Sequence, residues 1–291
     1  MAQIQFNKLD DFYRDYGVDP RETRSNKDLF RYICFENIEL IRKVNLPKIE
    51  LNQKNEAVII ESRNLPHLEF LIRNAILKLG QGWSHTVVCS PDNFKLISEI
   101  CNNIGEGINI LKSEQRWTGI DTFNQILYDK SFWNHLKGER ILIYQEDSII
   151  FRENIQDFLS YDYIGAPWGH QPFGLKYGNG GFSLRNRSMI IDILNDTPLV
   201  TKLIARLTDD SLQFSGVKMD KPAEDLFYSM AFNIKSSKMP SAETASYFST
   251  EHIVNTESLG GHQFWLFDTN WVDRMLKLLD GLKPTDPKKV S

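Results

Sequence analysis

The feature that most constrains the fold is a regular alternation of short apolar runs and longer amphipathic runs between residues 57 and 144. Apolar runs of this kind predict buried strands, and runs with apolar residues at helical spacing predict helices. Strands that alternate with helices form a mainly parallel sheet with helices on both faces, and ligands bind beyond the carboxyl ends of such strands. The sequence therefore predicts an α/β fold with strands at 57–62, 85–90, 108–112 and 141–144, and helices at 67–79, 93–104 and roughly 119–136.

The segments on either side of this alternation differ in character. Apolar residues recur at helical spacing over 27–44, which predicts a helical segment ahead of the sheet. Glycines, aromatic residues and short strand-like runs dominate from about residue 151 to 190, and helices are predicted at 187–195 and near 224–232. The expected organisation is an N-terminal helical extension over 1–54, one domain over 55–282 and a disordered tail over 283–291.

Composition excludes several classes of protein. The formal net charge is -4 and no long basic run occurs, so a nucleic-acid partner is not expected. Cys34, Cys89 and Cys101 are odd in number and form no CxxC pair, which indicates free thiols rather than a disulfide framework. The N-terminus lacks the pattern of a secretory signal, and no apolar run approaches the ~20 residues that span a bilayer. We therefore expect a cytoplasmic protein without a membrane span.

Acidic residues follow the fourth predicted strand at once. Gln145, Glu146 and Asp147 stand where the strand 141–144 leaves the sheet. Carboxylate oxygens suit Mg²⁺ or Mn²⁺, and such a cation can stabilise a diphosphate leaving group. The same acids are also compatible with a plain turn at the end of a strand, and both interpretations stay open.

A glycine-rich segment follows at 177–188 (YGNGGFSLRNRS). Asn179, Gly180 and Gly181 offer a backbone that a ligand can approach closely, although an ordinary hairpin turn would read alike. No helix opens directly after the glycines, so this is not a dinucleotide-binding motif. Trp168, in the run YDYIGAPW, is either a flat ring for stacking on a sugar or a core residue.

Two later positions complete the candidate site. Asp225 falls in the first turn of the helix near 224–232, where it is either a residue favoured by the helix dipole or a general base. His262 follows two glycines in LGGHQFW, which allows its side chain to enter a crowded place and to ligate Mn²⁺. His252 is a second candidate, and a polar core histidine is the alternative for both.

Taken in order, the runs QEDS, GNGGFSLR, AEDLFYS and GGHQFW resemble the GT-A glycosyltransferase superfamily over roughly residues 55–270. More narrowly, YDYIGAPW together with GNGGFSLR resembles an uncharacterised, GT-A-like family of unknown function. The resemblance implies a DxD-type motif at the end of a Rossmann-like half. It further implies a glycine-rich acceptor segment, an xED base motif and a late metal-binding histidine.

The resemblance assigns roles to the metal and donor residues by position. Asp147 matches the last acid of the DxD motif and His262 the late histidine, so both are implied metal ligands. Glu146 is the middle residue. Gln145 stands where the first acid is usual, and this departure puts the metal affinity in question.

The resemblance also assigns the catalytic and substrate positions. Asp225 matches the base of xED, and Glu224 would hold the acceptor. Glu61 and Arg63, after the first strand, match positions that hold the nucleotide base. Substrate binding is implied for Trp168, Asn179, Gly180 and Gly181.

These observations lead to the hypothesis of a metal-dependent, inverting glycosyltransferase that uses Mn²⁺ or Mg²⁺. Its donor would be a nucleotide-diphosphate-sugar, with a UDP-sugar favoured, and its acceptor the hydroxyl of a glycan, protein or lipid. One alternative is a metal-dependent hydrolase or nucleotidyltransferase that uses the same carboxylates. Another is a non-catalytic module that binds nucleotide-sugars or glycans, which Gln145 favours.

Overall fold

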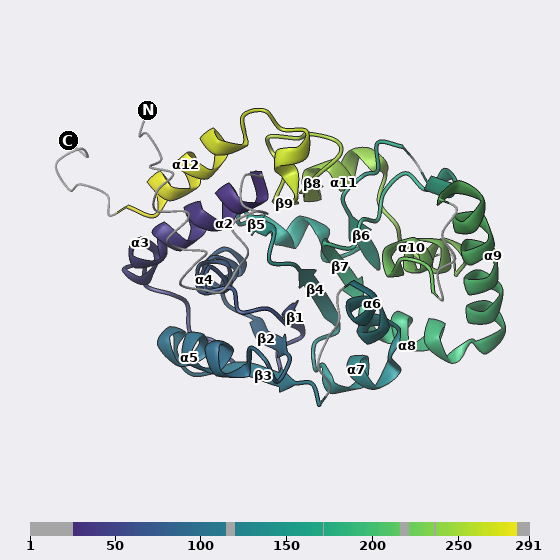
Figure 1. Ribbon diagram of the computed structural model, residues 1–291, viewed down its shortest axis with the longest axis horizontal. Coiled ribbons are helices and arrows are strands. Elements are labelled where there is room, and N and C mark those ends of the chain that lie inside the picture. Colours follow the sequence, from purple (N-terminus) through teal and green to yellow (C-terminus); the bar gives the residue numbers. More distant parts are fainter. Residues whose placement is uncertain (1–25, 115–119, 171, 216–220, 236, 284–291) are drawn as a thin grey trace.

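The computed structural model describes residues 26–114, 120–170, 172–215, 221–235 and 237–283. Its centre is a six-stranded sheet in the order β3-β2-β1-β4-β7-β6, in which β7 alone runs antiparallel to its neighbours (Figure 1). The strands are β1 Asn55–Glu61, β2 Trp83–Cys89, β3 Ile108–Lys112, β4 Arg140–Tyr144, β6 Tyr163–Gly165 and β7 Phe182–Asn186. This confirms the predicted fold class, a mixed and mainly parallel sheet flanked by helices.

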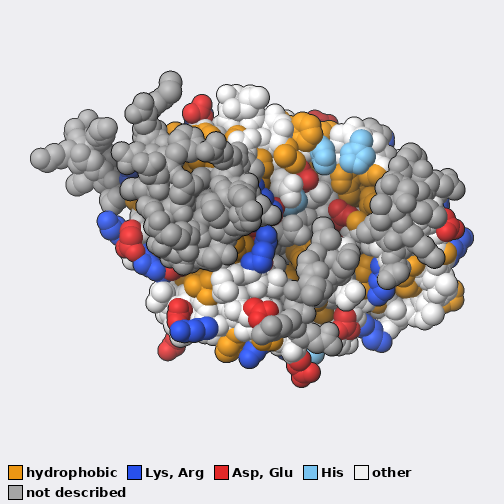
Figure 2. Space-filling model, in the orientation of Figure 1, with side chains coloured by type: hydrophobic (Ala, Val, Ile, Leu, Met, Phe, Trp, Pro, Cys, Tyr) orange, Lys and Arg blue, Asp and Glu red, His pale blue; other side chains and the backbone are white. Residues whose placement is uncertain are grey.

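Helices cover both faces of the sheet (Figure 1). One face is covered by α2 Asn26–Glu36, α3 Ile38–Arg42, α4 Leu68–Leu79, α5 Phe94–Ile104, α11 Ala242–Phe248 and α12 Trp271–Gly281. The other is covered by α6 Ile120–Tyr128, α7 Lys130–His135, α8 Arg187–Asn195, α9 Thr197–Ser215 and α10 Glu224–Ile234. On the described surface in Figure 2, acidic and basic side chains are interspersed.

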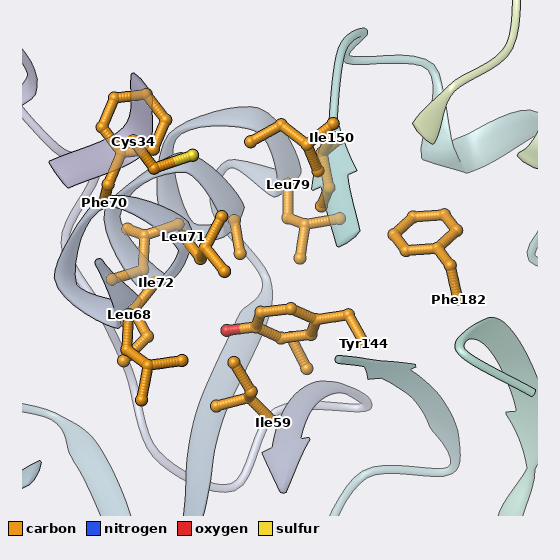
Figure 3. Packing of buried hydrophobic residues seen from close by; sticks show 14 of the residues in the cluster. Cys34, Ile59, Leu68, Phe70, Leu71, Ile72, Leu79, Tyr144, Ile150 and Phe182 are labelled. Atoms are coloured by element: carbon orange, nitrogen blue, oxygen red, sulfur yellow. The ribbon is translucent and has the colours of Figure 1, made fainter. Parts of the chain in front are cut away.

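Alternate residues of each central strand enter opposite cores, as the period of two in a strand requires. Ile59 of β1 packs on the side of α4, whereas Val58 and Ile60 pack on the side of α10. Figure 3 shows Ile59 and Tyr144 pointing toward the apolar side chains of α4. Burying one large aliphatic side chain contributes about 1.5–3 kcal/mol, so the two cores fix the strands and the loops at their carboxyl ends.

The structure differs from the sequence prediction in several elements. The single helix predicted over 119–136 is wrong, because the described part of this segment forms α6 and α7. Asp129 separates them, and its side chain accepts a hydrogen bond from the Ser131 amide at the start of α7. Helices α9, α11 and α12 were not predicted.

The segment ahead of the sheet joins the main core. Phe30 and Cys34 of α2 are fully buried in the cluster that contains α4. The ring of Phe30 lies 5.7 Å from Phe264 and 5.0 Å from Trp265, both in the short 3₁₀ turn η4 Phe264–Leu266. Helix α2 is thereby held beside the late part of the chain. The domain boundary at residue 54 stays a prediction, and the predicted tail lies outside the described residues except for Lys283.

A small second sheet joins the end of β4 to the late part of the chain. It consists of β5 Ser148–Ile150, β9 Gly260–His262 and β8 Ser249–Thr250, in the order β5-β9-β8. Strand β5 pairs with β9 so that Ser148 lies opposite His262. Asp147 directly precedes this pair, so the strand register brings it beside a residue that is 115 positions away.

The remaining general expectations concern thiols and membrane spans. Cys34, Cys89 and Cys101 are free and buried. Within the part of the chain that the structure describes, no helix combines the length and the apolar character needed to cross a bilayer.

Candidate active site

A cavity of about 390 Å³ opens at the carboxyl ends of β1 and β4, where the fold class predicts a ligand site. Its lining includes Lys27, Glu61, Arg63, Glu146, Asp147 and Gln263, together with Gln145. A larger hollow of about 760 Å³ lies beside residues 44–51 and contains none of the predicted site residues. The smaller cavity is therefore lined by the predicted donor-side residues, whereas Asp225 and His262 are not among its lining residues.

His262, the last residue of β9, lies between two buried carboxylates. Its Nε2 atom is 3.3 Å from Oδ1 of Asp147, and its Nδ1 atom is 3.3 Å from Oε2 of Glu251. A carboxylate beside one ring nitrogen fixes the orientation of a histidine and leaves the other nitrogen for a ligand. Glu251 thus directs Nε2 toward Asp147. Burial alone would lower the pKa of His262, but the charges of Asp147 and Glu251 raise it to about 10.

Several atoms of this cluster are buried without a well-formed hydrogen bond. Within the described residues this holds for Oδ1 of Asp147, Oε2 of Glu251 and both ring nitrogens of His262. Such atoms are rare in folded proteins and cost about 1–3 kcal/mol each. A carboxylate oxygen facing an imidazole nitrogen is a donor set that divalent cations commonly take. Asp147 and His262 therefore fit a metal ion that displaces the proton from Nε2 of His262.

The metal ligands from the chain would be few. No group of three or more His, Cys, Asp and Glu side chains within the described residues is arranged to hold a metal ion on its own. Mg²⁺ in particular is often bound by one or two side chains, with phosphate oxygens and water as the other ligands. The pair Asp147 and His262 suits a cation that arrives with a phosphate ligand.

Glu146, the residue before Asp147, is enclosed by basic groups. Arg31 makes two contacts with it, of 3.0 and 2.7 Å, and Nη2 of Arg63 lies 3.1 Å from its Oε1. Nε2 of His67 lies 3.3 Å from its Oε2. Burial would raise the pKa of Glu146, but the hydrogen bonds from His67 and Arg31 lower it well below its ordinary value. Glu146 is therefore ionised, and it holds the basic side chains around it in place at the cavity.

The cluster around Asp147 is completed from the chain after β9. Gln263 adopts the left-handed conformation, with φ of 44°, which is uncommon for a residue with a side chain. Its backbone amide donates to the carbonyl of Asp147 at 3.1 Å, and its Nε2 donates to Oδ2 of Asp147 at 3.0 Å. The strained backbone thus keeps Asp147 and His262 in register.

The glycine pair Gly180 and Gly181 lies between His262 and the acids that begin α10. A Cβ atom on Gly181 would collide with the ring of His262, and a Cβ atom on Gly180 would collide with Oε1 of Glu224. Both residues must be glycine for reasons of space, since neither has a positive φ. Oδ1 of Asn179 accepts a hydrogen bond from the Gly181 amide at 2.9 Å and shapes this turn.

Asp225 and Glu224 begin α10 on the far side of the glycines. Oδ2 of Asp225 accepts a hydrogen bond from the Gly180 amide at 3.3 Å. Glu224 is held by Arg185 in a buried two-point ion pair, with N···O distances of 2.6 and 2.9 Å. The guanidinium of Arg185 also lies over the rings of Tyr163 and Tyr228. Glu224 is thus fixed, whereas Asp225 stays partly exposed.

The environment of Asp225 raises the pKa of its carboxyl group. Burial and the neighbouring charge of Glu224 raise the pKa of Asp225 to about 7, although amide donors and Arg185 oppose the shift. A carboxylate with a pKa near the working pH accepts protons most effectively. Asp225 lies against Gly180 and His262 lies against Gly181, so the two adjacent glycines bring Asp225 near the pair Asp147 and His262.

Other predicted residues occupy different environments. Glu61 binds Arg63 through contacts of 2.8 and 2.7 Å, and both line the cavity. Trp168 is only 4% exposed, so little of its ring is open to a ligand, and its predicted role in substrate binding stays a prediction. His252 stands next to Glu251, and its ring contacts those of His170 and Phe267.

Sequence reasoning missed six residues of the site: Lys27, Arg31, His67, Arg185, Glu251 and Gln263. No local signal marks Lys27 or Arg31, which reach the site because α2 packs against the late part of the chain. Arg185 could have been found, because it follows Gly181 and Ser183 at the period of two on one face of a predicted strand.

A family model described as "Protein of unknown function (DUF5672)" matches residues 107–262, which is more than half of the chain. The chain belongs to this family. The DUF5672 match contains Asp147, Asp225 and His262, but not Lys27, Glu61 or Arg63. It supports the resemblance to a family of unknown function and names no activity. No curated protein matches the sequence.

Among solved structures, the DUF5672 chain is similar to the glycosyltransferase GlyE of Streptococcus pneumoniae TIGR4. The apo form of GlyE is 13% identical to this chain and has a TM-score of 0.45, and the match covers 78% of this chain and 62% of the GlyE chain. A second GlyE structure has 11% identity and a TM-score of 0.43, with coverage of 79% and 63%. The chain therefore spans less than two thirds of these structures, and at such TM-scores the similarity does not indicate a function.

Proposed function

We propose that this chain is a glycosyltransferase that moves a sugar from a nucleotide-diphosphate donor, with a UDP-sugar favoured, to an acceptor hydroxyl. The observation that carries the proposal is the arrangement around the glycine pair. Asp147 and His262, with unpartnered polar atoms, stand on one side, and the carboxylate of Asp225 stands on the other. A donor diphosphate near the first pair would place its sugar toward the second side.

In this proposal the carboxylate of Asp225 is the general base. Asp225 accepts the proton of the acceptor hydroxyl as that oxygen attacks the anomeric carbon. Arg185 and Glu224 hold the start of α10, so the position of Asp225 is fixed before the acceptor arrives. Attack assisted from the side opposite the leaving group inverts the anomeric configuration.

The proposed cofactor is Mn²⁺ or Mg²⁺, held by Asp147 and His262. When bound, such a cation would neutralise the negative charge that develops on the departing diphosphate. Glu251 orients His262 for this purpose, and Arg63, held by Glu61, lines the donor side of the cavity. The acceptor would be a glycan, protein or lipid.

The experiment that tests the proposal is a screen of nucleotide-sugars with and without Mn²⁺, read by thermal shift and by product analysis. A metal-dependent stabilisation by one donor, with slow turnover until an acceptor is added, is the expected result. Brisk hydrolysis without an acceptor would replace the proposal by a hydrolase. Binding of a donor without any need for metal and without turnover would replace it by a non-catalytic module.

Replacing Glu251 by glutamine is expected to weaken Mn²⁺ binding by about 10- to 100-fold, the usual effect of losing the carboxylate behind a ligating histidine. The amide keeps the shape of the side chain and removes the charge that holds Nδ1 of His262. Isothermal titration with MnCl₂ measures the change. Glu257→Gln, at an exposed ion pair with Arg152, is the matched control and should bind Mn²⁺ like the wild type. Equal affinities in both variants would argue against His262 as a ligand.

The pH profile of kcat/KM is expected to rise up to about pH 7 and then level off. The pKa of Asp225 is about 7, and only the deprotonated form can accept a proton. Activity is therefore lost as pH falls through the pKa. Initial rates between pH 5.5 and 8.5, at saturating metal, measure the midpoint. A flat profile over this range would contradict the assignment of Asp225 as the base.

A further inference from the structure

Lys27, in the first described turn of α2, reaches into the cavity and binds both carboxylates that follow β4. Its Nζ atom lies 2.7 Å from Oδ2 of Asp147 and 2.9 Å from Oε1 of Glu146. Its side chain is 31% exposed, whereas the two carboxylates are almost fully buried. The ammonium therefore lies at the boundary between the carboxylates and the open cavity, where a ligand would meet it.

The two carboxylates depend on Lys27 to different degrees. Glu146 also binds Arg31 at two points, and Arg63 and His67 lie within 3.3 Å of it. Asp147 pairs with no other Lys or Arg of the described chain. Its Oδ2 is bound by Lys27 and by the neutral amide of Gln263, and its Oδ1 faces His262 without a hydrogen bond. Lys27 is thus the flexible cation that, together with the imidazole of His262, compensates Asp147, the carboxylate proposed to take a metal.

A lysine can leave the carboxylate of Asp147 for another anion more easily than an arginine can. Its ammonium is a compact charge on a flexible four-carbon stem, and it holds Asp147 by a single contact rather than by a two-point fork. A divalent cation on Asp147 would stand next to this ammonium, and like charges at such short range repel strongly in a partly buried site. Metal and ammonium therefore compete for Asp147 unless a further anion enters.

We propose that Lys27 is an internal counter-cation of the metal site: it holds Asp147 in the absence of a divalent cation and passes to the diphosphate when metal and nucleotide bind. This inference rests on the proposed function. The diphosphate gives the displaced ammonium a new partner, so it removes the competition that opposes metal binding. Metal and nucleotide then bind cooperatively, and by linkage each strengthens the other by the same factor.

The test measures the affinity of the full chain for MnCl₂ by electron paramagnetic resonance, with and without saturating UDP. The variants are Lys27→Met, which removes the charge, and Lys27→Arg, which keeps it. Lys235→Met is the matched control, because Lys235 is similarly exposed at 36% and, among the described residues, forms its ion pair with Asp196. If Lys27→Met does not fold, Lys27→Gln serves instead, because it also removes the charge.

Without UDP, Lys27→Met is expected to bind Mn²⁺ more tightly than the wild type, by a factor within the 5- to 150-fold range of typical coupling energies. With UDP, its affinity should rise by a smaller factor than in the wild type. In the absence of UDP, Lys235→Met should stay close to the wild type, and Lys27→Arg, which keeps the charge, should bind Mn²⁺ no more tightly than the wild type.

The outcomes separate this inference from the proposed function. If the wild type binds Mn²⁺ and UDP together, and Lys27→Met changes neither the Mn²⁺ affinity nor its response to UDP, only the role of Lys27 is overturned. Weaker Mn²⁺ binding in Lys27→Met would likewise overturn it, since the lysine would then support the metal rather than compete with it. If neither the wild type nor Lys27→Met binds Mn²⁺, this inference fails together with the metal site.

Discussion

Replacing Asp225 by asparagine is expected to lower kcat by about 10²- to 10⁴-fold, the usual contribution of a general base. The amide keeps the size of the side chain but cannot accept the proton of the acceptor hydroxyl. Donor binding should change little, because Asp225 lies across the glycine pair from Asp147 and His262. Steady-state kinetics with a donor identified by the screen, and donor titration by calorimetry, measure the two effects separately.

Asp225→Asn is also expected to change how the melting temperature depends on pH. The pKa of Asp225 is raised in the folded protein to about 7, so the ionised form is less favourable there than in the unfolded chain. Asp225→Asn should therefore raise the melting temperature above pH 7, and the gain should vanish as pH falls toward 4, where both states bind the proton. Lower stability at pH 8, or full activity, would contradict the assignment of Asp225 as the base.

The control for both effects is another acid at the start of a helix. Asp129 caps α7 by accepting a hydrogen bond from the Ser131 amide, and unlike Asp225 it is exposed to solvent. Asp129→Asn should leave kcat unchanged. Asparagine is also a good capping residue, so the melting temperature should move little.

The sheet could be predicted from sequence because burial imposes a simple pattern on it. Strands β1, β2 and β4 are almost fully buried and contain apolar runs, whereas the edge strand β3 is only partly buried. The glycines after α4 and α5 mark the ends of those helices. The break between α6 and α7 was missed, because the apolar spacing continues through Asp129. The N-cap formed by Asp129 ends one helix and begins the next, and such a cap stabilises a helix start by only about 1 kcal/mol.

The site was predictable only where its residues sit at the ends of predicted elements. Asp147 follows β4, and Asp225 begins α10, so their places follow from the topology. Lys27 and Glu251 reach the site through packing of α2 and through the small sheet β5-β9-β8, which pairs segments more than 100 residues apart. Pairings of that kind depend on tertiary contacts, and no local pattern in one sequence reveals them.

Removing the guanidinium of Arg185 is expected to be among the most destabilising single changes in this chain. Arg185 is fully buried and Glu224 is only 3% exposed, so Arg185→Met would leave a buried carboxylate without its cation. Breaking one partner of a buried pair typically costs about 3–5 kcal/mol. Urea denaturation gives the free energy of unfolding. Arg152→Met, at an exposed pair with Glu257, should cost no more than about 1 kcal/mol.

The double variant Arg185→Met/Glu224→Gln decides the cause of that loss. If the unpaired charge is responsible, removing it should recover much of the stability, and the double-mutant cycle should show a coupling of about 0.5–3 kcal/mol. If the double variant is as unstable as the single one, lost packing of Arg185 between Tyr163 and Tyr228 is responsible instead.

Arg185 and Glu224 also affect the pKa of Asp225, so changes to this ion pair should alter activity as well as stability. Glu224 raises the pKa of Asp225 and Arg185 lowers it. Arg185→Met should therefore move the midpoint of the kcat/KM profile above pH 7, whereas Glu224→Gln should move it below, because each change removes one of two opposing charges. Midpoints that move together, or not at all, would mean that the profile reports a group other than Asp225.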